Sequence, residues 1–227
     1  MRGKQLGCVL SAVLLAILPG SAAGASLIVL NDDFDGALAA FPAVTRTATY
    51  GGTSTWAATD AAAAGFTANG DVWYGVNLDQ IAALTWSPID TSPLQSVWLS
   101  IDLGARSPTG GGFESSDSLE ILVNGTRVDY FQGVPVANAP DVLANSQGAQ
   151  LSSVLATFVY DITALVTGTD SVVIQALNNV DSEHLAFDNV IVGGVAVPEP
   201  ASFVFWMLAT AGGSTLVWVR RRRGARA

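Results

Sequence analysis

Two groups of acidic residues lie near opposite ends of the central part of the chain. Asp32, Asp33 and Asp35 follow an apolar run, and Asp188 with Asn189 lies close to the end of the last β-rich segment. If the first and last strands are neighbours, their carboxylates face each other, and a hard cation with oxygen ligands relieves the repulsion. We therefore predict a structural calcium site at Asp33, Asp35 and Asp188. The alternative is that these are solvated turn residues, because Asp is favoured where strands end.

A second acidic group contains Asp181, Glu183 and the only histidine, His184. A metal ligand or general base is one interpretation of this histidine, and an exposed loop residue is the other. A single histidine excludes a multi-histidine zinc site. The sequence has no GxSxG, HExxH or Walker motif. Paired carboxylates could form a glycosidase site, but a domain with 18 acidic residues offers many chance pairs. Glu114 and Glu120 are candidates for such a pair only because glutamate is scarce.

Aromatic residues are concentrated between Trp56 and Trp86 in a stretch that is rich in Gly, Ala, Thr and Asn. Aromatic rings can stack on the apolar faces of sugars, and Trp73 and Tyr74 follow a loop-like Asn-Gly-Asp sequence. These two residues are our candidate carbohydrate contacts. Core packing is the alternative for most of these rings, since aromatics bury large areas. Trp73 and Tyr74 cannot both face the core of an extended segment, because neighbours in a strand point to opposite faces.

The elements that must position these residues are short strands. Residues 97–103 alternate between apolar and polar side chains, and residues 119–123 lead into Asn124-Gly125, the strongest short hairpin signal. Further strands are predicted at 154–160, 171–177 and 185–192, whereas the alanine-rich residues 57–64 predict one short helix. Many short strands separated by turn residues indicate an all-β fold, a β-sandwich or jelly roll.

Three segments resemble the jelly-roll, lectin-like modules of secreted proteins. They are the opening Asn31 to Gly36, the central Ser116 to Gly125 and the closing Leu185 to Val192. The resemblance implies a jelly-roll-like β-sandwich, and in some such modules it implies structural calcium where the first and last strands meet. It does not by itself establish function.

Composition limits the partners of the central domain. Residues 26–197 contain three arginines, no lysine and 18 of the 19 acidic residues, so this part carries a net charge of −15 although the whole chain carries −9. Such a surface repels nucleic acid and favours divalent cations or neutral ligands such as sugars. Cys8 is the only cysteine and lies in the predicted signal peptide, so disulfides and thiolate chemistry are not expected after cleavage.

Both ends of the chain have the pattern of targeting segments. Arg2 and Lys4 precede an apolar run and an A-x-A-like site at residues 23–25, which predicts a signal peptide over residues 1–25. Near the other end, Ala201 to Val219 is apolar and uncharged and has about the length that crosses a bilayer. Four arginines, Arg220, Arg221, Arg222 and Arg223, follow it and would be held on the cytoplasmic side. A buried C-terminal helix is the alternative.

The C-terminal pattern at residues 197–223 is similar to the PEP-CTERM sorting signal of exported bacterial proteins. The resemblance rests on the motif Pro198, Glu199 and Pro200, the apolar run and the arginine block. It implies processing by a membrane-embedded protease, an exosortase, and a transmembrane helix that anchors the protein only transiently. Release to the cell surface or the extracellular matrix would follow.

Together these features predict three segments: a signal peptide (1–25), a β-sandwich domain (26–196) and a sorting signal (197–223). We expect an exported, non-enzymatic protein of the cell surface or exopolysaccharide matrix that binds carbohydrate and is stabilised by calcium. The alternatives are a secreted polysaccharide hydrolase with paired carboxylates and a self-associating matrix protein.

Overall fold

The computed structural model of the chain describes residues 25–36, 43–108, 112–137, 139–179 and 183–197. The sorting motif at 198–200, the arginines at 220–223 and all but the last residue of the predicted signal peptide lie outside these ranges, as does Asp181. Within the described ranges, no helix has the length and apolar character needed to cross a bilayer.

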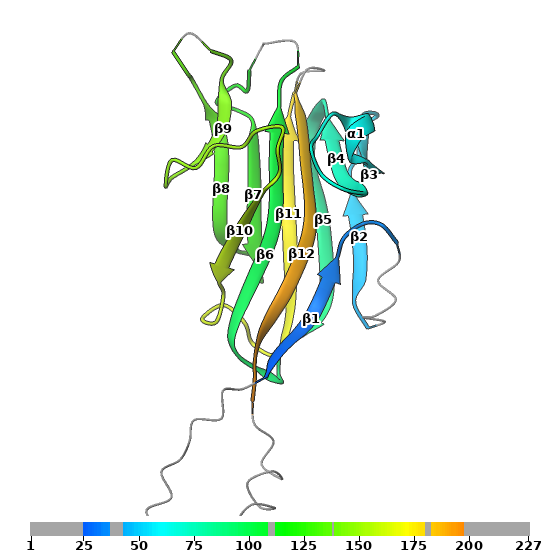
Figure 1. Cartoon of the computed structure of the whole chain (residues 1–227), viewed down its shortest axis with the longest axis vertical. Helices are drawn as coiled ribbons and strands as arrows, with labels where there is room; N and C mark the ends of the chain where they lie inside the picture. The colour runs from blue at the N-terminus through cyan, green and yellow to red at the C-terminus, as the bar shows by residue number, and fades with distance from the viewer. Residues whose placement is uncertain (1–24, 37–42, 109–111, 138, 180–182, 198–227) are drawn as a thin grey trace, which may run out of the picture.

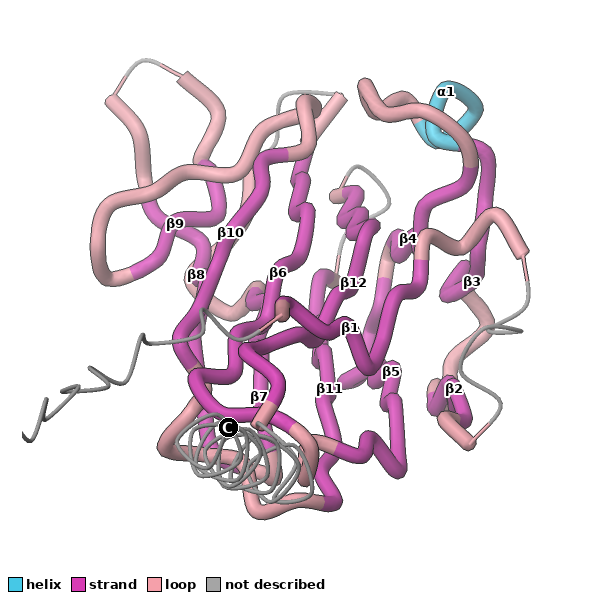
Figure 2. The backbone as a smooth tube through the Cα atoms, turned by 60° about the horizontal axis from the view of Figure 1, so that its bottom comes forward, coloured by secondary structure: helices cyan, strands magenta, loops and turns pink. Residues whose placement is uncertain are grey.

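The described residues form two antiparallel sheets of six strands each, which lie face to face (Figure 1 and Figure 2). Sheet A has the order β10-β6-β12-β4-β3, with β1 also paired to β12, and sheet B has the order β2-β5-β11-β7-β8-β9. The strands of sheet A are β1 (Ser26–Asp32), β3 (Thr55–Asp60), β4 (Asp71–Val76), β6 (Leu94–Arg106), β10 (Ala156–Asp161) and β12 (His184–Ala196). Those of sheet B are β2 (Thr45–Thr49), β5 (Leu78–Asp90), β7 (Ser118–Val123), β8 (Thr126–Val134), β9 (Val142–Asn145) and β11 (Thr169–Asn178). The predicted all-β sandwich is confirmed.

The first and last strands are neighbours, as the resemblance to jelly-roll modules implies. β1 pairs antiparallel with β12, so that Asp32 lies opposite Val190 and Ser26 opposite Val195. The two ends of the domain therefore meet at one end of the sandwich, where the Ala196 N–H donates to the Ala25 carbonyl at 2.9 Å. This pairing brings the two predicted groups of acidic residues to the same region.

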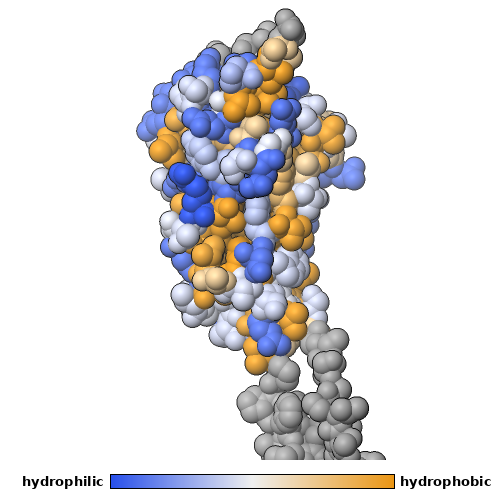
Figure 3. Space-filling view, turned by 90° about the vertical axis from the view of Figure 1, so that its left-hand side faces the viewer, coloured by the Kyte–Doolittle hydropathy of each residue, from blue (hydrophilic) through white to orange (hydrophobic). Residues whose placement is uncertain are grey.

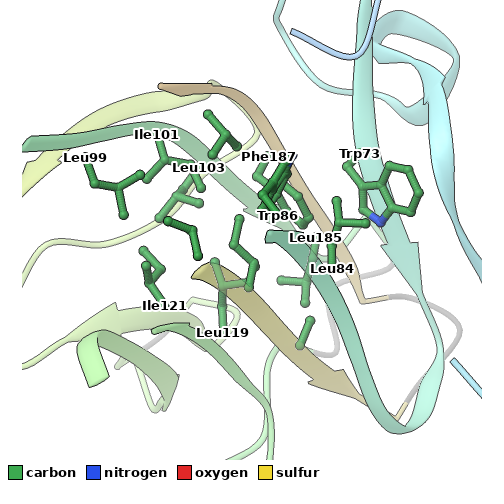
Figure 4. Packing of buried hydrophobic residues seen from close by; sticks show 14 of the residues in the cluster. Trp73, Leu84, Trp86, Leu99, Ile101, Leu103, Leu119, Ile121, Leu185 and Phe187 are labelled. Carbon is green, nitrogen blue, oxygen red and sulfur yellow. The ribbon is translucent and has the colours of Figure 1, made fainter. Parts of the chain in front are cut away.

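The core lies between the sheets and is built from the alternating apolar positions of both. In β6 the predicted residues Val97, Leu99, Ile101 and Leu103 are buried, and in β7 and β11 every second residue is buried. Figure 4 shows Leu99, Ile101 and Leu103 of β6 and Leu119 and Ile121 of β7 between the two layers, in the same cluster as Trp86 and Phe187. In these alternating strands one face lies in the core and the other faces outward, and only the outward side chains can contact a ligand.

The predicted hairpin is confirmed. β7 and β8 are joined at Asn124-Gly125, and both turn residues have positive φ, 51° and 76°. These are the angles of a type I′ turn, whose twist matches that of the flanking strands. Past the turn, Arg127 pairs with Leu122, but the next residue of β7, Ile121, pairs with Asp129. β8 therefore contains one extra residue at this point, which is a β-bulge.

The alanine-rich segment at 57–64 differs from the predicted helix. Its first half belongs to β3, and only Ala61–Ala64 form a helix, α1. Asp60 ends the strand and caps the helix by accepting a hydrogen bond from the Ala63 N–H at 2.8 Å. Gly65 ends the helix one turn later in the left-handed conformation. β3 pairs with β4 over its whole length, so sheet pairing overrides the helix propensity of alanine there.

Candidate functional site

A groove of about 480 Å³ lies beside strands β8 and β9 of sheet B, and we call it the β8–β9 groove. The groove is lined by Arg127, Val128, Asp129, Tyr130, Gln132, Val134, Ala144, Asn145 and Ser146. Figure 3 shows the side of the molecule on which these strands lie, where polar surface is interspersed with small apolar patches. The groove therefore combines an aromatic ring, a guanidinium group and amides on a sheet scaffold.

Two lining side chains, Arg127 and Tyr130, together with the adjacent Glu120 of β7, define the chemistry of the groove. Tyr130 lies directly opposite Glu120 of β7 on the outer face of sheet B. The Arg127 Nε donates to the Glu120 carboxylate, and its guanidinium carbon lies 4.5 Å from the centre of the Tyr130 ring. The Arg127 side chain is 58% exposed, and the Tyr130 hydroxyl makes no hydrogen bond to another described residue. Donor and acceptor groups are thus available beside an aromatic surface.

The floor of the groove is held in place from the core side. Asp129 points inward and accepts hydrogen bonds from the Tyr160 hydroxyl and the Asn145 amide, each at 2.9 Å. Burial, together with the neighbouring Asp129 carboxylate, raises the pKa of Tyr160, so its hydroxyl remains a donor. The Gln132 amide donates to the Ser115 carbonyl at 2.5 Å. The surface that a ligand would meet is consequently preorganised.

A larger groove, of about 950 Å³, lies where the ends of β1 and β5 meet, and it is less suited to specific binding. Its described lining consists of aliphatic, proline and small polar residues, with Asp90 as the one charged side chain among them. None of these described lining residues is aromatic. We therefore place the candidate binding site at the β8–β9 groove, although it is the smaller of the two.

The predicted calcium residues occupy one region. Asp188 is 4% exposed, and burial, followed by the carboxylates of Asp102, Asp35 and Asp33, raises its pKa to about 7. The Asn189 amide bridges Asp188 and Asp102 at 3.2 Å and 2.8 Å. The oxygens of Asp33, Asp35 and Asp188 nevertheless do not come within 4.8 Å of one another as a group of three among the described residues.

Individual contacts explain this spacing. The Asp33 carboxylate accepts a hydrogen bond from the Asp35 N–H at 3.3 Å, and the Asp35 carboxylate accepts one from the Asp71 N–H at 2.6 Å. Both carboxylates are therefore engaged by backbone N–H groups. Asp32 is withdrawn from the group altogether, because it is buried against Arg46 and Trp86. Negative charge is therefore concentrated in this region, but the carboxylates of Asp33, Asp35 and Asp188 would have to move closer together to bind one ion.

The predicted carbohydrate contacts, Trp73 and Tyr74, point to opposite faces of β4. Trp73 is 8% exposed and packs against Phe34 and Trp56, with ring centres 5.7 Å and 5.9 Å away. A ring in this position cannot stack on a sugar, so the expectation is wrong for Trp73. Tyr74 is half-buried, and its hydroxyl lies 3.1 Å from Nδ1 of His184. It belongs to a polar contact on sheet A.

The remaining candidates are also placed by the structure. His184 begins β12 and is held between Tyr74 and Arg106, whose Nε donates to Nδ1 at 3.3 Å; it is not an exposed loop residue. Glu120 is occupied by Arg127, whereas Glu114 lies next to Asp117 and Glu183. Glu114 and Glu120 therefore have different partners and belong to separate clusters.

Sequence reasoning missed the β8–β9 groove. Its signal was the hairpin at Asn124-Gly125, which fixes β8 beside β7. A regular register would have paired Glu120 with Asp129, because the residues would then match one for one from the turn outward. The bulge shifts the register by one residue and turns Tyr130 to the outer face.

No protein-family model matches the chain, and no curated protein sequence matches it significantly. Solved structures with a similar fold include the K3 adhesin domain of Lys-gingipain from Porphyromonas gingivalis, at 12% identity and a TM-score of 0.43, covering 73% of this chain and 98% of that one. A family 11 carbohydrate-binding module of a cellulosomal cellulase from Clostridium thermocellum has 13% identity and a TM-score of 0.38, covering 79% and 99%. A xylan-binding module has 12% identity and a TM-score of 0.40, covering 77% and 99%. At such identities and TM-scores these likenesses carry no information on the ligand or activity of this chain.

Proposed function

We propose that this protein is an exported, non-catalytic β-sandwich that binds polysaccharide through the β8–β9 groove. The observation that carries the proposal is the arrangement of Arg127, Glu120 and Tyr130 on the outer face of sheet B. Sugar rings combine an apolar face with hydroxyl groups that both donate and accept. A site with an aromatic ring and charged hydrogen-bonding groups side by side meets both requirements.

The charge of the domain supports a neutral ligand. A lysine-free domain with a net charge of −15 repels polyanions over its whole surface. Arg127 does not reverse this field locally, because it is paired with Glu120. Neutral glycans meet no such barrier, whereas nucleic acid does.

Export and sorting complete the proposal. The signal peptide at 1–25 would direct the chain out of the cytoplasm, and the segment at 197–223 would anchor it until an exosortase-type protease cuts near Pro198, Glu199 and Pro200. The domain would then reach the cell surface or the exopolysaccharide matrix, with the transmembrane helix as a temporary membrane contact. What supports this step is the sequence pattern of the two ends.

Structural calcium at Asp33, Asp35 and Asp188 is a second part of the proposal. Its support is the concentration of carboxylates where β1 and β12 meet, together with the raised pKa of Asp188. A divalent cation there would replace carboxylate repulsion by ligation and would tie the first strand to the last.

The direct test of binding is a pulldown of the full-length chain, in detergent, on purified insoluble matrix polysaccharides. Tyr130→Ala removes the aromatic ring of the groove, and Tyr50→Ala is a matched control, since Tyr50 is also half-buried but lies at the end of β2. We expect wild type and Tyr50→Ala to be retained and Tyr130→Ala to be lost in the wash. Equal retention of all three, or of none on any glycan, would refute the assignment.

A further inference from the structure

Three carboxyl groups outside the calcium position predicted at Asp33, Asp35 and Asp188 converge next to the starts of β7 and β12. Glu114, Asp117 and Glu183 each contribute one oxygen, and these oxygens all lie within 4.8 Å of one another. Asp117 and Glu183 are fully buried, whereas Glu114 is exposed. The cluster joins the chain just before β7 to the chain just before β12. We call it the Glu114 cluster.

The backbone fixes the first two members of the Glu114 cluster in a tight turn. The Asp117 N–H donates to the Glu114 carbonyl at 2.9 Å, and the Glu114 N–H donates back to Oδ2 of Asp117 at 2.5 Å. The Gly133 N–H of β8 donates to the Asp117 carbonyl at 3.1 Å. Gly133 is required there, because a Cβ would lie 1.9 Å from the Glu114 carbonyl oxygen.

Asparagines on β11 and in the loop that follows it position the third member. The Asn179 N–H donates to Oε2 of Glu183 at 3.1 Å, and the Asn178 side-chain amide donates to the Glu183 carbonyl. Asn178 is itself buried and accepts the Leu78 N–H at 2.9 Å. The Glu183 carboxyl is therefore held by the sheet B framework and does not lie in a freely moving loop.

One carboxylate oxygen of the Glu114 cluster is buried without a hydrogen-bond partner among the described residues. Oδ1 of Asp117 is buried and accepts no hydrogen bond from any residue in the described part of the chain. Buried acceptors are nearly always satisfied by protein, water or an ion. This unsatisfied oxygen, buried within a cluster of three carboxyl groups, points to a cation that the cluster would bind.

We propose that Glu114, Asp117 and Glu183 bind a divalent cation that prefers oxygen ligands, with Ca²⁺ as the first candidate. Three carboxylates supply three to six of the six to eight oxygens that Ca²⁺ takes, and water can complete the shell through the exposed side of Glu114. The cluster contains no histidine or cysteine, which makes it a poor zinc site. Mg²⁺ demands a stricter octahedron and gives up water reluctantly, so it should bind more weakly.

This site is distinct from the calcium position proposed at Asp33, Asp35 and Asp188. Its effect would be to join the loops that precede β7 and β12 at the end of sheet B that carries Gln132 of the β8–β9 groove. Ser118, the first residue of β7, pairs with Gln132, and the Gln132 amide donates to Ser115 inside the same turn. An ion in the Glu114 cluster would therefore stabilise the framework of the groove without contacting a ligand in it.

The test is a calcium titration of the full-length chain in detergent after removal of metal by chelation. Asp188→Asn serves as the starting chain, so that binding at the other proposed position does not contribute. We expect this chain to bind one Ca²⁺, with a rise in Tm of roughly 5 to 10 °C at 100 times the Kd. Adding Asp117→Asn should abolish this binding, and adding Glu114→Gln should raise the Kd at least about tenfold.

Glu114→Gln keeps the test decisive if Asp117→Asn fails to fold, because the Glu114 side chain is exposed and its loss should leave the metal-free Tm unchanged. Glu120→Gln is the matched control, since it removes a carboxylate from the neighbouring β7 outside the cluster, and it should leave calcium affinity as it was. The proposal is overturned if the folded Asp188→Asn chain takes up no calcium. It is equally overturned if Glu114→Gln binds calcium as tightly as its parent. Loss of polysaccharide binding in any of these chains would not affect either conclusion.

Discussion

Asp32 and Arg46 form an ion pair that links the two sheets of the sandwich. Nη1 of Arg46, on β2 of sheet B, donates to both carboxylate oxygens of Asp32, the last residue of β1 in sheet A, at 2.7 Å and 2.9 Å. The Trp86 indole N–H donates to the same carboxylate at 2.7 Å. The charge of the Asp32 carboxylate is thereby compensated inside the core. The calcium candidates at the end of β1 are reduced to Asp33 and Asp35.

Replacing Arg46 by Met should destabilise the fold strongly, because it leaves the buried Asp32 carboxylate with an uncompensated charge. We expect the free energy of unfolding to fall by about 3 kcal/mol, near the lower end for a buried pair since Arg46 is 23% exposed. Urea denaturation at pH 7 measures this change. The double substitution Arg46→Met with Asp32→Asn should recover part of the loss, and a single variant as stable as wild type would contradict the account.

Much of the fold follows from the sequence because the signals are local. The alternation in residues 97–103 predicts β6, and Asn124-Gly125 predicts the β7–β8 hairpin with its two positive φ angles. The neighbouring first and last strands are also predicted, from the resemblance to jelly-roll modules, and they are confirmed. For β6 and the β7–β8 hairpin, a pattern of two to seven residues carries the information.

The sites depend on features that no local pattern contains. The bulge on β8 determines that Tyr130 faces outward. The packing of sheet A, which contains β1, against sheet B, which contains β2, brings Asp32 to Arg46. Trp73 looks like a loop aromatic in the sequence, but it follows the alternation of β4 into the core. The Glu114 cluster joins residues about 70 positions apart. Register shifts and long-range contacts arise from packing and cannot be read from spacing.

The free energy of unfolding should depend on pH through Asp170, which connects the hairpin to β11. Burial disfavours its charge, but hydrogen bonds from Thr91, Asn124 and Thr167 outweigh burial and lower its pKa. A lowered folded pKa contributes stability above the unfolded value of about 4, and this stability is lost as the pH falls through the folded pKa. Asp170→Asn should therefore cost about 1.5 to 3 kcal/mol at pH 7 and much less at pH 3.

Urea denaturation of both chains at the two pH values checks this expectation. Asp90→Asn, an exposed position on the neighbouring strand β5, is the control and should change stability little at either pH. A cost of Asp170→Asn that is the same at pH 3 and pH 7 would show that the ionised carboxylate is not the stabilising form.

Calcium at the β1–β12 junction should appear as a stabilisation that requires Asp188. Millimolar CaCl₂ should raise the Tm of the wild-type chain, because a ligand that binds only the folded state stabilises it. Asp188→Asn should reduce that rise, whereas Asp161→Asn, an exposed position on β10, should not. Scanning calorimetry with CaCl₂ and with chelator gives the measurement, and an equal rise in both variants would remove the site.

The C-terminal segment should be cut only when its motif is intact. We expect mass spectrometry of protein recovered from a host with an exosortase to show loss of the residues that follow the motif. Replacing Pro198, Glu199 and Pro200 by alanine should leave the full tail in the membrane fraction, since the protease would no longer recognise it. An uncut wild-type chain in such a host would contradict the proposed sorting.

The central claim is that the β8–β9 groove binds polysaccharide, and an affinity titration with a soluble neutral glycan retained in the pulldown tests it most directly. Tyr130→Ala and Arg127→Ala should each weaken binding by about tenfold, as expected for an aromatic or charged hydrogen-bonding contact of about 1.4 kcal/mol. Tyr50→Ala should bind as wild type does, and all variants should keep their Tm within a few degrees. If Tyr130→Ala and Arg127→Ala bind the glycan with the wild-type Kd, the groove is not the binding site.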